Sequence, residues 1–175
     1  MRVNNFFSKP IIFAMLISSA LFITPPAFSA QEDIDLLNSY IGNWKGSGKL
    51  LRDGNSETIR CKLSVTDSQG SKIGYKGRCA VAGANISIAG TMAFIEEKKR
   101  FEAVMSSSTS FSGVAIGNRA KSGINFYLKD RNAETGDKYE IKSSIDLNGD
   151  IIGIDFSVTN TTTNRVIKAN IPFGR

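Results

Sequence analysis

The chain has 175 residues, with 22 Lys and Arg against 16 Asp and Glu, two Cys and no His. The absence of histidine removes the commonest general base, metal ligand and haem ligand, and we expect no enzyme, metal or cofactor. The charges are interspersed along the sequence, whereas nucleic-acid binding favours a concentrated basic stripe. We therefore expect no nucleic-acid partner and only a weak attraction to anionic envelope surfaces.

The first 29 residues have the features of an export signal. Arg2 and Lys9 precede a 13-residue apolar stretch, residues 11–23, which is too short to span a membrane as a helix. Small residues then mark cleavage after Ser29, with Ala30 as the alternative. We expect residues 1–29 to be removed and residues 30–175 to form one periplasmic or secreted domain without a transmembrane segment.

One helix and ten strands are predicted in the mature chain. Residues 31–40 have acids in the first turn and Ile34 and Leu37 on one apolar face, which is typical of a short helix. From residue 42 onward, apolar and polar residues alternate in short segments divided by turn residues. The predicted strands are 42–51, 56–66, 72–81, 85–95, 100–108, 110–117, 123–129, 138–147, 150–159 and 165–173.

Three turns predict how neighbouring strands pair. A hairpin centred on Asn148-Gly149 places Ile145 opposite Ile152 and Ile141 opposite Phe156. The turns at 96–99 and 161–164 give further apolar pairs on one face of each ribbon. These pairs are Phe94–Phe101, Met92–Ala103, Val158–Ile167 and Phe156–Ala169.

The position of a turn also predicts how the two cysteines pair. A turn around Gln69-Gly70 places Cys61 opposite Cys79 in adjacent strands, and across the preceding hairpin Gly46 falls opposite Cys61. An even number of cysteines in an exported protein favours a disulfide. We therefore expect a Cys61–Cys79 bond, which would stabilise the fold by about 3 kcal/mol.

Ten strands with one apolar face each must hide that face from water. Closure into a barrel does so and also removes the exposed edge strands. The sequence therefore predicts an all-β fold, an antiparallel up-and-down β-barrel of 8–10 strands with a short N-terminal helix. A two-sheet sandwich is the alternative.

The stretch Gly42-x-Trp44-x-Gly46-x-Gly48, placed after a short helix, resembles the opening of calycin barrels, the superfamily of lipocalins, fatty-acid-binding proteins and avidins. It also looks like the opening of nitrobindin-type barrels. With Glu57, Arg60-Cys61 and Arg78-Cys79-Ala80 added, the pattern resembles a group of uncharacterised small exported alphaproteobacterial proteins.

The resemblance implies a structural role for Trp44. Calycin barrels pack a basic side chain from the last strand over this Trp, which implies Arg175 here, with Arg165 the lesser candidate. We expect Trp44 to plug the closed end rather than to line a ligand site. Nitrobindin-like proteins hold haem through a histidine, which this chain lacks, so haem binding is not carried over.

No catalytic set is apparent, because serines lack a histidine partner and both cysteines are expected to be bonded. The first functional hypothesis is a small, mainly apolar ligand inside the barrel, at the end away from Trp44. Small inward residues would leave space for it, and Tyr139 and Ser143 would orient it. The small residues are Gly46, Gly48, Gly77, Gly90, Ala103 and Ser143, and the expected aromatic walls are Phe94, Phe101, Phe126, Tyr139 and Phe156.

Two other functions stay open. One is an envelope interaction protein, such as a protease inhibitor or a scaffold, with a solid core. The other is an outer-membrane barrel with its apolar face outward, which the scarcity of Trp and Tyr disfavours. A measured cavity would separate the first hypothesis from the second. The oligomeric state is not predicted.

Overall fold

The computed structural model of the chain describes residues 29–108, 112–132 and 135–175. Almost all of the predicted signal, residues 1–28, lies outside the described residues. No helix in the described ranges is long and apolar enough to cross a membrane.

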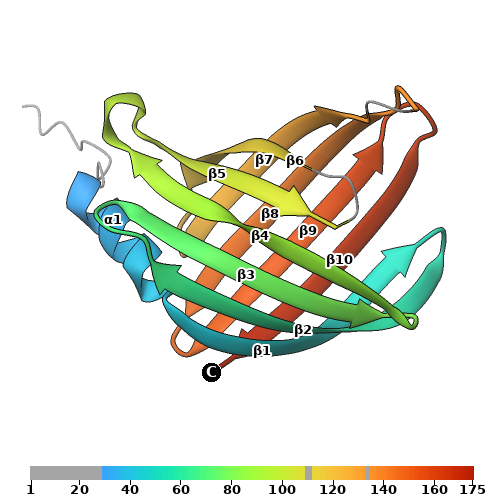
Figure 1. Ribbon diagram of the computed structural model, residues 1–175, viewed down its shortest axis with the longest axis horizontal. Helices are drawn as coiled ribbons and strands as arrows, with labels where there is room; N and C mark the ends of the chain where they lie inside the picture. Colours follow the sequence, from blue (N-terminus) through green and yellow to red (C-terminus); the bar gives the residue numbers. More distant parts are fainter. Residues whose placement is uncertain (1–28, 109–111, 133–134) are drawn as a thin grey trace, which may run out of the picture.

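Within the described residues, the fold is a closed antiparallel barrel of ten strands with one short α-helix, α1 (Ala30–Ser39), packed at one end (Figure 1). Each strand pairs with the next along the chain, and the last strand closes the barrel against the first. The predicted up-and-down barrel is therefore confirmed. The strands are β1 (Gly42–Arg52), β2 (Asn55–Asp67), β3 (Lys72–Val81), β4 (Ala84–Ile95), β5 (Arg100–Ser107), β6 (Ser112–Arg119), β7 (Gly123–Arg131), β8 (Lys138–Asn148), β9 (Ile151–Asn160) and β10 (Arg165–Gly174).

The helix begins with a capping box. The Ser29 hydroxyl accepts a hydrogen bond from the Glu32 backbone N–H, and the Glu32 carboxylate accepts one from the Ser29 backbone N–H. The pair satisfies two backbone donors that the first turn leaves free. Cleavage after Ser29 would remove this cap, whereas α1 itself lies wholly within the predicted mature domain.

Most of the predicted pairing is confirmed, and one hairpin is wrong by two residues. The pairs predicted from the turns at 96–99 and 161–164 are all present. In the β8–β9 hairpin, however, Ile145 faces Ile154 and Ile141 faces Val158. The two-residue turn is Gly149-Asp150 rather than Asn148-Gly149, and Gly149 adopts the positive φ that its first position requires. A shift of two preserves the faces, so every side chain keeps its predicted side.

The apolar faces of the strands point into the barrel and form one core. Its most deeply buried members lie near α1 and the turns at that end. They include Leu37, Trp44, Ile73, Phe101, Ile124 and Ile152. We call this end of the barrel, together with α1, the closed end, and the part of the barrel away from α1 the open half.

Candidate functional site

Trp44 is the centre of the closed end. Only 1% of its surface is exposed, and its indole Nε1 donates a hydrogen bond to the Tyr40 carbonyl, with 2.8 Å between the atoms. The guanidinium carbon of Arg175 lies 4.5 Å from the centre of the indole ring, a cation–π contact. Gly42 makes room for it, because a Cβ there would lie 3.2 Å from an Arg175 nitrogen. Arg165 is at the other end of β10.

Tyr40 links the helix to the far wall of the barrel. Its hydroxyl donates to the Ile145 carbonyl of β8 at 3.0 Å. Burial raises the pKa of this hydroxyl well above its usual range, and the nearby charge of Asp146 raises it further. Tyr40 is therefore neutral at physiological pH and acts as a hydrogen-bond donor.

An ion pair fastens α1 to the barrel. Arg119, at the end of β6, lies 3.0 Å from the buried carboxylate of Asp33 and also donates to the Glu32 carbonyl at 3.3 Å. This contact was not predicted from the sequence. The signal was present in part, because Arg119 falls on the inward-facing side of its strand and Asp33 is in the first turn of the helix.

The structure separates the six predicted ligand-lining residues into two groups. The rings of Phe94 and Phe101 pack in a tilted arrangement, with 5.2 Å between ring centres and 59° between planes, next to the turn that joins β4 and β5. This turn is at the closed end, because turns of a meander alternate between the two ends of a barrel. The prediction that these two rings lie away from Trp44 is therefore wrong, and they belong to the plugged end.

The other four predicted residues lie on neighbouring strands of one wall. Ser143 of β8 faces Phe126 of β7 on one side and Phe156 of β9 on the other. Tyr139 is further along β8, close to the mouth of the open half. Phe126 is buried, whereas Ser143, Phe156 and Tyr139 are half-buried.

At three of the small inward residues, the space that was expected inside the barrel is already filled by a neighbouring side chain. Phe173 lies against Gly46, Ile88 against Gly77, and Tyr75 against Gly90, each so close that a Cβ would meet the side chain within 3 Å. These glycines let large neighbours lie flat on the inner wall. Tyr75 thereby reaches the Val104 carbonyl at 3.2 Å, and burial raises its pKa to about 12.

Solvent nevertheless reaches part of the open half. Ile88 of β4 and Met105 of β5 point inward and are half-buried, as are Ile141 of β8 and Phe156 of β9. Figure 1 shows β8 and β9 behind β4, on the far side of the barrel. Inward residues near the mouth of β1–β3 are fully buried instead, among them Leu50, Ile59 and Val81. The accessible interior therefore lies between β4–β5 and β8–β9.

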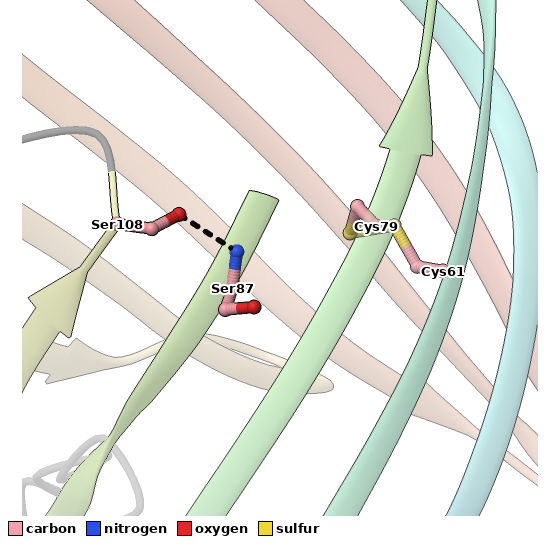
Figure 2. The surroundings of a disulfide bond; sticks show 4 residues. All are labelled: Cys61, Cys79, Ser87 and Ser108. Atoms are coloured by element: carbon pink, nitrogen blue, oxygen red, sulfur yellow. Dashed lines mark hydrogen bonds between the residues drawn. A yellow bond between two sulfur atoms is a disulfide. The ribbon is translucent and has the colours of Figure 1, made fainter. Parts of the chain in front are cut away.

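The predicted disulfide is present. Cys61 and Cys79 face each other across β2 and β3 and are bonded, with their sulfur atoms on the inward side (Figure 2). Figure 2 also shows the Ser87 backbone N–H donating to the Ser108 hydroxyl at 3.0 Å. This bond continues the β4–β5 pairing one residue past the end of β5, up to the undescribed residues 109–111.

On the outside of the described part of the barrel, two hollows differ in size and lining. The larger, about 710 Å³, crosses β1 and β6–β10. Outward-facing Lys142 and Ser157 line it together with parts of Phe126, Ser143 and Phe156. The smaller, about 570 Å³, lies over β1–β4 and is lined by Lys45, Arg60, Lys62 and Arg78 among others.

No protein-family model and no curated protein matches this sequence. Among the solved structures that resemble its fold are two with low sequence identity. The S-type phycobiliprotein lyase CPES from Guillardia theta has a TM-score of 0.58 and 10% identity, with 86% of this chain and 98% of that one covered. Rv2717c from M. tuberculosis has a TM-score of 0.63 and 12% identity, with 82% and 96% covered. These likenesses support the barrel fold.

Proposed function

We propose that the protein is an exported, non-enzymatic barrel that holds one small, mainly apolar molecule in its open half. The observation that supports this most is the half-burial of inward apolar side chains on facing walls, such as Met105 and Phe156. Apolar surface that folding leaves accessible to water inside a barrel favours an apolar occupant. The Cys61–Cys79 bond fits an oxidising compartment outside the cytoplasm.

The number of strands supports the same proposal. Barrels of eight strands have an interior that side chains just fill or that holds one small ligand. Ten strands enclose a wider interior, and here the closed end takes up only part of it. Dispersion and burial would supply most of the affinity, with few polar anchors.

Ser143 is the best candidate for such an anchor. Its half-buried hydroxyl points inward between Phe126 and Phe156, and among the described residues it has no protein hydrogen-bond partner. A ligand with one hydrogen-bonding group near its middle would satisfy it. Tyr139, nearer the mouth, would contact the part of the ligand that enters last.

An envelope interaction protein with a solid core is the second candidate. The observation that favours it is the filling of the inner wall by large side chains laid over Gly46, Gly77 and Gly90. If this filling continues through the open half in solution, no ligand would enter.

Binding of an apolar fluorescent probe tests the proposal. Ser143→Phe adds a ring inside the open half and should weaken probe binding at least about tenfold, because the ring occupies the site without removing a wall. Ser157→Phe is the matched control. It adds the same bulk one strand away, on the outside and at the edge of the larger hollow, and should leave binding unchanged.

Each other outcome contradicts the proposal. A probe displaced by Ser157→Phe but not by Ser143→Phe occupies the outer hollow. A probe that binds the folded protein no better than the unfolded chain indicates a solid core and supports the interaction protein. A native mass spectrum of protein taken from its own cells should also show the added mass of one retained ligand.

A further inference from the structure

The outward-facing side of β10 and β1–β4 carries basic residues and no acidic ones. Its cations all lie at exposed positions, whereas the carboxylates of the outer strand surfaces are on β5, β8 and β9. We call this surface the basic face. Its cations are Lys45, Lys49, Arg60, Lys62, Lys72, Lys76, Arg78 and Lys168.

Three of these cations stand directly opposite one another in adjacent strands. Lys45 of β1 faces Lys62 of β2, which faces Arg78 of β3. Like charges directly opposite in a sheet are destabilising. Among the described residues, none of the three is in an ion pair. The arrangement therefore lowers stability unless something anionic covers it.

The rest of the outer surface is arranged differently. Glu102 of β5 contacts Arg100 and Lys98, at 2.6 and 3.0 Å, and their hydrogen bonds hold its pKa below the usual range. Glu140 of β8 lies 3.6 Å from Lys129. Arg100 and Lys129 on that side are thus paired with acids, whereas the outward positions of the basic face hold no carboxylate.

The centre of the basic face is hollowed. Lys45, Arg60, Lys62 and Arg78 surround the smaller hollow of about 570 Å³. Pro172, Ala80 and the backbone near Gly46 and Cys61 form much of the remaining lining. A phosphate-sized group fits such a hollow with cations on several sides.

We propose that the basic face docks the protein on the head-group surface of a bilayer containing anionic phospholipid. Six of the eight cations are lysines, and no aromatic side chain is at an outward position of these five strands. Protein interfaces are depleted in lysine and enriched in arginine and aromatic residues. Single-stranded nucleic acid is held by aromatic stacking. A lysine-rich face without aromatics favours hydrated lipid phosphates.

The dimensions of the face also favour a membrane surface. Its cations lie on four neighbouring strands, which span about 14 Å at about 4.8 Å spacing, and they extend along the strands from Lys72 to Lys168. This is a broad area rather than a narrow groove that would follow a nucleic-acid backbone. Lys45, Lys62 and Arg78 are on successive strands about 4.8 Å apart, so these three act together within about one Debye length at 0.1 M salt. The face is on the side of the barrel, so docking leaves the mouth of the open half uncovered.

Co-sedimentation with lipid vesicles tests the proposal. It uses the full protein as purified from the cells that produce it. Vesicles of phosphatidylcholine with about one third phosphatidylglycerol are compared with vesicles of phosphatidylcholine alone. The uncharged vesicles measure any binding that an apolar N-terminal segment contributes without anionic lipid. Lys45→Gln, Lys62→Gln and Arg78→Gln are combined in one variant. We expect a loss of about fivefold per basic residue, and so about a hundredfold in all, on the anionic vesicles only.

The matched control removes the same charge elsewhere. Lys121→Gln, Lys138→Gln and Lys142→Gln together lower the net charge equally, but these residues lie outside the basic face. The control should lose less than about threefold, and increasing salt should release the wild-type protein. Equal losses in the two variants, or equal binding to both kinds of vesicle, would overturn the proposal. Tighter binding of duplex DNA or of an acidic protein at the same salt would assign the face to that partner instead.

Discussion

The closed end and the open half of the barrel are built from the same strands but differ in packing. At the closed end, Trp44 is buried, hydrogen-bonded and covered by Arg175, and Asp33 is paired with Arg119. In the open half, inward apolar side chains such as Met105 remain half-buried. The half-buried part of the open half, between β4–β5 and β8–β9, is therefore freer to differ in shape than the plug around Trp44.

Inward-facing residues of the barrel are fully buried at some positions and accessible at others. Phe101 and Phe156 are both inward-facing aromatics, yet only Phe101 is fully buried. The alternation of side chains along a strand indicates that a residue points into the barrel. Its position along the barrel axis decides whether it belongs to the plug around Trp44 or to an accessible wall.

The largest expected effect is at the centre of the plug. Trp44→Ala should lower the free energy of unfolding by about 3–5 kcal/mol, because it removes a fully buried ring and its hydrogen bond. Phe156→Ala, in the half-buried wall, should cost about 2 kcal/mol or less. Denaturant titration of both variants measures the difference. Equal losses would mean that the two ends are packed alike.

The disulfide should be worth about 3 kcal/mol, because it restricts the unfolded chain between Cys61 and Cys79. Cys61→Ala combined with Cys79→Ala should show this loss in chemical denaturation. Wild-type protein kept in reductant is the control, since it loses the bond but keeps both sulfur atoms. A loss in the variant alone would assign the effect to packing rather than to the cross-link.

The smallest expected effect is at the rim of the closed end. The side chain of Arg175 is 51% exposed, so its contact with Trp44 should contribute about 0.5–1 kcal/mol. Arg175→Gln should lose this amount and change the fluorescence of Trp44. Asp150→Asn tests the other partner of Arg175, which lies 3.8 Å away and is 92% exposed, and should change nothing measurable. A larger effect at Asp150 would make the ion pair the main contact.

Local turn chemistry was sufficient to predict most of the fold. The turns at 96–99 and 161–164 fixed their registers, and the Cys61–Cys79 pairing followed from the turn at Gln69-Gly70. The hairpin register was wrong because both Asn148-Gly149 and Gly149-Asp150 are suitable two-residue turns. The positive φ of Gly149, which a sequence does not reveal, fits the first position of the second turn.

The site was harder to predict because it depends on position along the barrel axis. Phe94 and Phe101 point into the barrel as the sequence predicts, but they are packed in the core of the closed end. The room expected beside Gly90 is occupied by Tyr75, a residue from the neighbouring strand. Propensity and periodicity describe one strand at a time, and these contacts cross strands.

The basic face illustrates a further limit of one-dimensional patterns. Lys45, Lys62 and Arg78 are far apart in the sequence, where acidic residues such as Asp53, Glu57 and Asp67 intervene. Those acids fall in turns, at strand ends or on the inner side, so the outer side of the sheet keeps only the cations. Charges that are interspersed along the sequence are therefore separated in the structure, because successive residues of a strand point to opposite faces of the sheet.

The pairing of β1 with β10 also has a kinetic consequence. The seam joins the first strand of the barrel to the last, so closure is the contact of greatest sequence separation and carries the largest loop-closure entropy. Until β10 arrives, β1 and β9 are open edges that can pair with other chains. The rate at which this barrel forms, and its tendency to aggregate on the way, should therefore depend on its final ten residues more than on any other strand.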